Sequence, residues 1–233
     1  MTHRIFAVAL AAVLTGLAWA QPPNVDAFVE EVITTAEAIQ DSQFLALGRL
    51  IDGDGSEIPL ELEVQLVPGA SVASVYIVQP DALADNIIVL QGDAVYNYTF
   101  LTHQITIFDS DDPDALGGLI GVDDAADDLD VDATFDVRHH LAAFEPALVG
   151  EEDTPYGPAW VVRFDNADED AQVASFDAVV PTSTMLPYTF RVRNADGEIW
   201  AELAFENLVL DQGLTADEAA YLPEDAERID LRD

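Results

Sequence analysis

Residues 86–108, with the sequence NIIVLQGDAVYNYTFLTHQITIF, decide the fold class of this chain. They contain three segments at 86–90, 94–100 and 104–108 that are rich in branched and aromatic side chains, which is typical of β-strands. Short turns at Gly92-Asp93 and Leu101-Thr102 separate the segments. Because parallel strands need crossover connections of about a dozen residues or more, this spacing predicts an antiparallel meander.

Similar segments lie on both sides of the meander, and we expect about ten strands in all. Residues 60–66 alternate cleanly between apolar and polar, so their apolar side chains share one face. The other predicted strands are 44–51 and 72–78 before the meander, and 160–164, 173–180, 187–193 and 198–210 after it, with a hairpin turn at 194–197. No change of composition marks a linker, so residues 21–233 are expected to form a single, mainly β domain with helices (α+β).

Three helical segments are expected beside the strands. Asn24 is a suitable N-cap for an amphipathic helix that runs to about Gln40. A second helix is predicted over residues 133–143, because apolar residues recur there at helical spacing and Pro146 prevents its continuation. Residues 215–218 have the pattern of a capping box, which begins a short third helix.

Residues 1–20 have the pattern of a cleavable secretory signal peptide. Arg4 precedes an almost wholly apolar segment, and Ala18-Trp19-Ala20 supplies small residues at the two positions that a signal peptidase recognises. The apolar segment is shorter than the roughly 18 to 20 residues that span a bilayer. We therefore expect cleavage after Ala20 and export without an anchor, and the chain has no cysteine that could carry a lipid or a disulfide.

The chain is strongly acidic, with 45 acidic residues, eight arginines, no lysine and a formal net charge of −37. Nucleic acid is excluded as a partner, because its binding depends on neutralising phosphates with cations. Half of the residues are hydrophobic and regularly patterned, which predicts a folded chain rather than a disordered one. We interpret the acidity as a solubilising surface suited to a salty or harsh exterior, with a specific cationic partner as the alternative.

No residue pattern indicates an enzyme, a cofactor or a metal centre. The chain has no nucleophile elbow, glycine-rich phosphate loop or HExxH motif. Residues 52–57 partly match a calcium loop, but Glu57 occupies the sixth position, which an EF-hand reserves for glycine, so we predict a hairpin turn. His139 and His140 are adjacent and would point about 100° apart on a helix. The acid-rich segments 109–114 and 123–132 are interpreted as solvated loops, with a weak divalent-cation site as the alternative.

Alternating aromatic and aliphatic residues leave two interpretations of the interior. In the first, they pack a solid core. In the second, a strongly curved sheet of about ten strands encloses a cavity, and an apolar lining would bind an apolar ligand. The residues expected to line such a cavity are Leu60, Leu62, Val64, Leu66, Tyr96, Tyr98, Phe100, Ile105, Ile107, Trp160, Val162, Phe164, Phe190, Val192, Leu203 and Phe205.

The order of these elements resembles the LolA family of periplasmic carriers of outer-membrane lipoproteins. The similar features are Gln79-Pro80-Asp81 ahead of the meander at 86–106, Leu186-Pro187 before a strand, Asp196-Gly197 in a hairpin, and 205–208 followed by Leu214 and Leu222-Pro223. The resemblance covers most of the mature chain. It implies an unclosed antiparallel β-barrel with helices over its open side, and a cavity that receives the acyl chains of lipoproteins.

The resemblance also implies a monomer in the periplasm that takes lipoproteins or other acyl-chain lipids from an inner-membrane release complex to an outer-membrane acceptor. The chain departs from the family at Val67, before Pro68, where the family has an arginine that helps to hold the lid shut, and in its acidity. One alternative is a periplasmic sensor on the same fold, although such sensors carry an additional C-terminal domain and this chain ends at Asp233. The other is a secreted, non-catalytic structural or interaction domain with a filled core.

Overall fold

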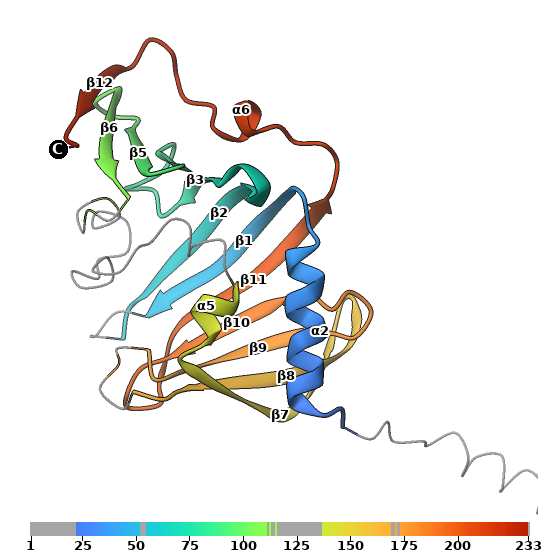
Figure 1. Ribbon diagram of the computed structural model, residues 1–233. Helices are drawn as coiled ribbons and strands as arrows, with labels where there is room; N and C mark the ends of the chain where they lie inside the picture. The colour runs from blue at the N-terminus through green and yellow to red at the C-terminus, as the bar shows by residue number, and fades with distance from the viewer. Residues whose placement is uncertain are drawn as a thin grey trace, which may run out of the picture.

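A single twelve-stranded sheet forms the body of the computed structural model, which describes residues 22–51, 55–110, 112, 115, 137–168, 171 and 173–232. The strands are β1 (Ser42–Ile51), β2 (Glu57–Val67), β3 (Val72–Gln79), β4 (Ile87–Gln91), β5 (Ala94–Thr99), β6 (Gln104–Asp109), β7 (Phe144–Thr154), β8 (Gly157–Asn166), β9 (Ser175–Pro181), β10 (Thr189–Arg193), β11 (Ile199–Leu210) and β12 (Glu227–Asp230). Their order across the sheet is β12-β6-β5-β4-β3-β2-β1-β11-β10-β9-β8-β7 (Figure 1). The two end strands are not paired with each other, so the sheet is unclosed.

The predicted antiparallel meander is confirmed. Strands β1 to β6 each pair with the next, and β7 to β11 do the same, all in antiparallel register. The two halves join where β1 pairs with β11, and β12 is parallel to β6. The ten predicted strands are all present, with ends that differ by a few residues.

Strands β7 and β12 were not predicted, and the second predicted helix is shorter than expected. Helix α5 covers only Val137–Leu141, while Phe144 and Leu148 belong to β7. Pro146 excludes a helix at this point, but it is tolerated in β7 because β7 is an edge strand with no partner on one side. Residues 133–136 of the predicted helix lie outside the described residues, as do the signal peptide, residues 52–54 and the loop 123–132.

The other two helices begin as predicted. Helix α2 covers Val25–Glu37, and the Asn24 side chain accepts a hydrogen bond from the Ala27 N–H at 3.0 Å. It ends three residues before the predicted Gln40, whose N–H instead donates to Asp211 at 2.8 Å. Helix α6 covers Ala216–Ala219 and has the predicted capping box between Thr215 and Glu218. A single 3₁₀ turn, η1 (Pro68–Ala70), connects β2 to β3.

The sheet has an inner face, over which α2 and α5 lie, and an outer face on the opposite side (Figure 1). Along β8, Val162 and Phe164 point to the inner face and pack against α2, so Arg163 points to the outer face. The C-terminal segment 211–230 crosses to the outer face of β4, β5 and β6. There its residues Leu222 and Ala226 pack into an apolar cluster. The far end of the sheet is therefore covered on its outer side.

Candidate functional site

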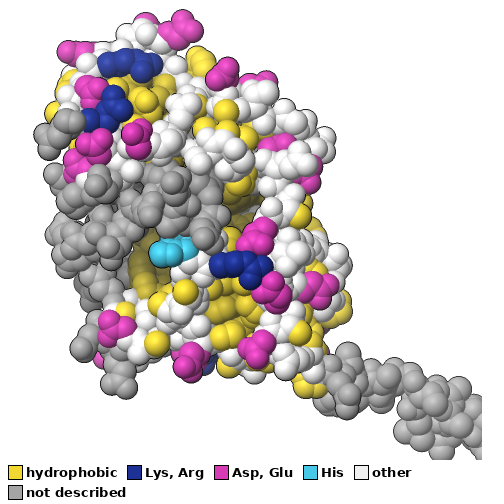
Figure 2. Space-filling view, in the orientation of Figure 1, with side chains coloured by type: hydrophobic (Ala, Val, Ile, Leu, Met, Phe, Trp, Pro, Cys, Tyr) yellow, Lys and Arg dark blue, Asp and Glu magenta, His cyan; other side chains and the backbone are white. Residues whose placement is uncertain are grey.

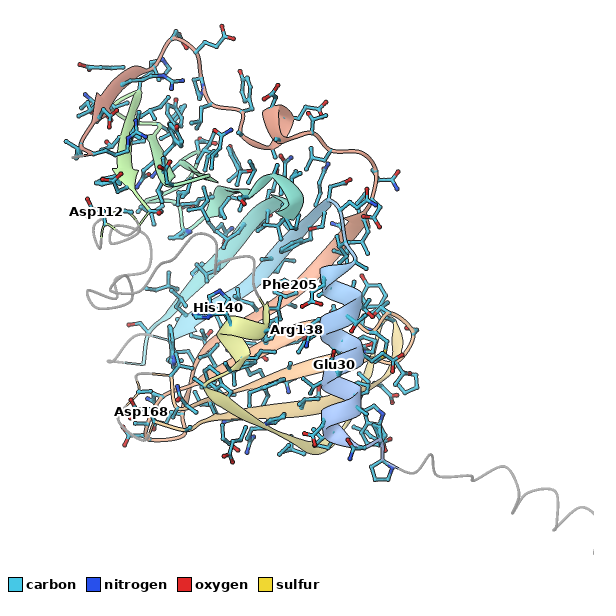
Figure 3. All side chains as sticks on the ribbon, in the orientation of Figure 1. Glu30, Asp112, Arg138, His140, Asp168 and Phe205 are labelled. Carbon is cyan, nitrogen blue, oxygen red and sulfur yellow. The ribbon has the colours of Figure 1, made fainter. Side chains whose placement is uncertain are left out.

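A cavity of about 280 Å³ lies between the inner face of the sheet and the two helices α2 and α5. Its walls come from the two helices, and its floor comes from β8, β9 and β10 (Figure 3). The lining residues are Val29, Val32, Ile33, Ala36, Val137, His140, Leu141, Val162, Phe164, Phe176, Ala178, Val180, Pro187 and Phe190. Among the described residues that line it, His140 alone has a polar side chain, so this part of the lining offers almost entirely apolar contacts.

Local sequence patterns explain why these side chains converge. Residues 29, 32, 33 and 36 of α2 recur at intervals of three and four, which places them on one stripe of the helix. The strands supply alternate residues, since every second side chain points to the same face. Val162 of β8 and Phe190 of β10 lie on either side of Ala178 in direct register. The small side chain of Ala178 leaves space between these larger neighbours.

Six phenylalanines cross the inner face side by side, and we call them the phenylalanine row. Each comes from a different strand among six neighbours, in the order Phe44 (β1), Phe205 (β11), Phe190 (β10), Phe176 (β9), Phe164 (β8) and Phe144 (β7). From Phe44 to Phe164, successive ring centroids lie 5.1, 5.6, 5.8 and 4.7 Å apart, and the Phe144 ring lies 5.1 Å from that of Phe176. These distances are typical of interacting aromatic pairs. The row extends the apolar floor of the cavity from the sheet edge to its middle.

One arginine joins the two helices that cover the cavity. Arg138 of α5 donates to both carboxylate oxygens of Glu30 at 2.8 Å each, and to Glu37 at 2.6 and 3.3 Å. The hydrogen bonds to these two α2 carboxylates raise the pKa of the Arg138 guanidinium, and the hydrogen bond from Arg138 lowers the pKa of Glu30. We call Arg138, Glu30 and Glu37 the rim triad.

Arg138 places a positive charge in the layer of helices over the cavity, whereas Val67, at the start of η1, carries none. Figure 3 shows Arg138 between α5 and α2, with Glu30 on the facing side of the helix, while His140 lies on the side of α5 toward the middle of the sheet. In Figure 2, a basic side chain flanked by two acidic ones stands at this position, and hydrophobic side chains fill the hollow around it. The charged groups of the triad thus lie beside an apolar opening.

Eleven of the sixteen predicted lining residues lie on the inner face. Three of them, Val162, Phe164 and Phe190, line the cavity. The other eight share the inner face but lie outside the cavity lining, and they are Leu60, Leu62, Val64, Leu66, Trp160, Val192, Leu203 and Phe205. Leu62 packs against the buried cluster around Ile77, and Phe205 belongs to the phenylalanine row.

The remaining five predicted residues do not line the cavity. Tyr96, Tyr98, Ile105 and Ile107 are on the outer face, where Leu222 and Ala226 of the C-terminal segment cover them. Phe100 lies in the turn after β5 and is 51% exposed. The prediction failed here because β4 to β6 have apolar side chains on both faces, so alternation alone does not tell which face is the inner one.

Several cavity residues were not predicted as a site. Phe176, Ala178 and Val180 come from β9, and the others come from α2, α5 and the turn before β10. The apolar stripe of α2 was visible in the sequence and indicated an apolar partner. Its partners, which begin with Leu141, are more than 100 residues away along the chain, and local patterns do not reveal such pairings.

The outer face of strands β8 to β11 and β1 carries charged groups. Asp177, whose side chain is 5% exposed, accepts hydrogen bonds from Arg163 at 2.7 Å and from Arg193 at 2.9 Å. Burial acts to raise the pKa of Asp177, but the hydrogen bonds from the two arginines outweigh it and hold the pKa below its ordinary value. Arg49 and Arg191 both pair with Glu202, at 3.2 and 3.1 Å. These pairs span β1, β11, β10, β9 and β8.

Among the described residues, no group of three or more His, Cys, Asp or Glu side chains is arranged to hold a metal ion. In the same part of the chain, no helix has the length and hydropathy needed to cross a membrane.

Solved structures with the same fold identify the architecture. An uncharacterized conserved protein from Thermus thermophilus matches with a TM-score of 0.59 and 18% identity, over 88% of this chain and 98% of that one. MucB matches with a TM-score of 0.51 and 14% identity over 87% of this chain, which spans 64% of MucB. The Mycobacterium tuberculosis lipoprotein LppX matches with a TM-score of 0.50 and 11% identity, over 82% of this chain and 97% of LppX.

The structural neighbours also include a LolA superfamily protein from Nitrosomonas europaea, with a TM-score of 0.40 and 13% identity, over 86% of this chain and 99% of that one. This chain has the fold of the Thermus thermophilus protein, MucB and LppX. The unclosed antiparallel sheet with helices on its inner face, predicted from the sequence, is confirmed. At these identities the fold is shared, and function has to be argued from the site. No protein-family model and no curated protein matches the sequence.

Proposed function

We propose that this protein is a non-catalytic periplasmic carrier that binds the acyl chains of lipoproteins, or of other lipids, in the cavity on the inner face. The observation that carries the proposal is the cavity of about 280 Å³, in which thirteen of the fourteen lining residues in the described part of the chain are apolar. The phenylalanine row supports it, because it continues the apolar floor beyond the cavity. The signal peptide pattern of residues 1–20 supports export and cleavage after Ala20.

The size of the cavity agrees with reversible binding. A group the size of a water molecule occupies about 30 Å³ in a liquid, so the cavity has room for about nine methylenes. Each buried methylene contributes about 0.8 kcal/mol, and the sum of about 7 kcal/mol is opposed by association costs of about 4 kcal/mol or more. The net affinity is moderate, which suits a carrier that must release its cargo.

Export of the full chain, with its own signal peptide, into the periplasm of a bacterial host provides the test. The purified protein is extracted with organic solvent, and the extract is analysed by mass spectrometry. We expect lipids with acyl chains at a stoichiometry near one, and displacement of a fluorescent fatty-acid probe. Absence of both co-purified lipid and probe binding would overturn the carrier proposal in favour of a structural or interaction domain.

A pair of variants on one helix connects binding to the cavity. Ala36→Trp introduces an indole into the cavity and is expected to abolish probe binding, because Ala36 lines it. Ala27→Trp is the matched control, since Ala27 is exposed on the same helix and is not part of the lining. Equal loss of binding in both variants would contradict the assignment to this cavity.

The partners to test for cargo exchange are an inner-membrane release complex and an outer-membrane acceptor.

A further inference from the structure

The positive charges of the folded chain are either remote from the cavity or already neutralised beside it. Beyond residue 21 the sequence has seven arginines and no lysine. Four of these arginines, at positions 49, 163, 191 and 193, pair with carboxylates on the outer face. Arg228 and Arg232 lie in and just after β12, at the opposite end of the sheet from β8. None of the seven lines the cavity.

Arg138 is the one arginine next to the cavity, and both of its partners are acidic. Its guanidinium makes four hydrogen bonds, two to Glu30 and two to Glu37, so its donor groups are directed to the protein rather than to a ligand. With two carboxylates and one guanidinium, the rim triad carries a net charge of −1. The rest of the molecule adds to this negative potential, because the chain has a net charge of −37.

The head group of a bound lipid would sit where the acyl chain leaves the cavity. A carboxylate or phosphate at that place would lose part of its hydration without gaining a cation, which is costly in a partly apolar environment. The like charges of the rim triad would oppose it further. An uncharged head group avoids both costs. His140, the polar lining residue, offers a donor and an acceptor to a hydroxyl or ester group when its ring is neutral.

We propose that the cavity selects acyl-chain ligands whose head group is uncharged, and discriminates against ligands with a carboxylate or phosphate head. The proposal rests on the carrier function proposed above and names the class of lipid carried. The rim triad excludes anionic head groups, and the apolar cavity with the phenylalanine row holds the chain.

Two ligands with the same twelve-carbon chain test the selection. Monolaurin has an uncharged glycerol head, and laurate carries an ionised carboxylate at pH 8. Each is titrated against the protein loaded with the uncharged fluorescent probe N-phenyl-1-naphthylamine at low ionic strength. We expect monolaurin to displace the probe at concentrations at least tenfold lower than laurate. This difference in affinity should be smaller in 0.5 M NaCl, because salt at that concentration reduces the range of electrostatic interactions to a few ångströms. Equal affinity for the two ligands would overturn the proposal.

A double variant locates the selection at the rim. Glu30→Gln with Glu37→Gln removes the two carboxylates and leaves Arg138 able to meet an anion, so laurate affinity should rise at least fivefold while monolaurin stays within twofold. The matched control is Glu57→Gln with Glu202→Gln. It changes the net charge by the same amount on the outer face, among the partners of Arg49, and should leave laurate affinity within twofold.

The outcomes separate this proposal from the carrier proposal. An equal gain in laurate affinity in both double variants would show that net charge alone has this effect, and it would overturn the proposed selection by the rim triad. Loss of monolaurin binding in the rim variant would show that the triad keeps the site assembled rather than sorting head groups, and would also overturn it. If the unaltered protein binds neither the probe nor monolaurin, the carrier function itself fails.

Discussion

The substitution Ala178→Leu should weaken ligand binding while leaving the fold as stable as before, or more so. Ala178 is 2% exposed on β9 and lines the cavity between Val162 and Phe190. Leucine adds three carbon atoms, which take up about 90 Å³ of cavity volume at about 30 Å³ each. Because the three added carbons fill apolar cavity space, the new side chain should increase the free energy of unfolding by about 1 kcal/mol.

The expected loss of affinity follows from the same three carbons. A bound acyl chain would have about three fewer methylenes inside the cavity, at about 0.8 kcal/mol each. The total of about 2.4 kcal/mol corresponds to binding that is about 50-fold weaker. Probe displacement gives the affinity, and urea unfolding followed by tryptophan fluorescence gives the free energy of unfolding.

Ala159→Leu is the matched control for this substitution. Ala159 has the same 2% exposure on the neighbouring strand β8, but it packs with Val161 and Val179 in a cluster away from the cavity. Leucine there overpacks the cluster and should lower the free energy of unfolding by about 1–3 kcal/mol without changing affinity. If Ala178→Leu destabilises the protein as much as Ala159→Leu does, the cavity does not exist in solution and the reasoning fails. Unchanged affinity in Ala178→Leu would refute the position of the acyl chain.

Two further predictions concern charge. Asp177→Asn leaves Arg163 and Arg193 without their carboxylate and should cost about 2 kcal/mol at pH 7, less than a fully buried pair because the arginines are 35% and 23% exposed. Since the folded pKa of Asp177 is lowered, its contribution is present above its ordinary pKa of 3.8 and is lost as the pH falls through the lower folded value. Urea unfolding from pH 7 to pH 3 should therefore show the two proteins converging below pH 3.8, and a constant difference would contradict the assignment. Raising NaCl from 10 to 500 mM should increase Tm by about 3 °C or more, because screening relieves repulsion among the 45 acidic residues. A decrease in a thermal scan would mean that the ion pairs outweigh this repulsion.

The sequence was sufficient for most of the sheet, because ten strands combine alternation with turn residues at their ends. Strand β7 was missed because residues 151–153 are all acidic and Pro146 interrupts its start. Strand β12 has four residues, Glu227–Asp230, with a single aliphatic side chain, and it exists because β6 offers a free edge. Both strands depend on pairing with a distant segment rather than on their own propensity.

The site was predicted less completely than the fold. Alternation identified which apolar residues of a strand share a face, but not which of the two faces turns toward the helices. Tyr98 and Phe164 look alike in the sequence, yet Tyr98 is covered by Leu222 and Phe164 by α2. The link between Arg138 and Glu30 joins residues 108 positions apart, and neither residue belongs to a motif that indicates the other.

The pairing of β1 with β11, and of β6 with β12, has a consequence for how the chain acquires its structure. Ser42 pairs with Leu210 and Gln104 with Glu227, so the contacts that join the two halves and cover the outer face use the last quarter of the chain. Contacts between residues so distant in sequence form slowly, because a long loop must close first. Until the C-terminal segment has emerged, the apolar outer face of β4 to β6 lacks its cover. The topology therefore delays completion of the fold until residues 211–230 have been synthesised.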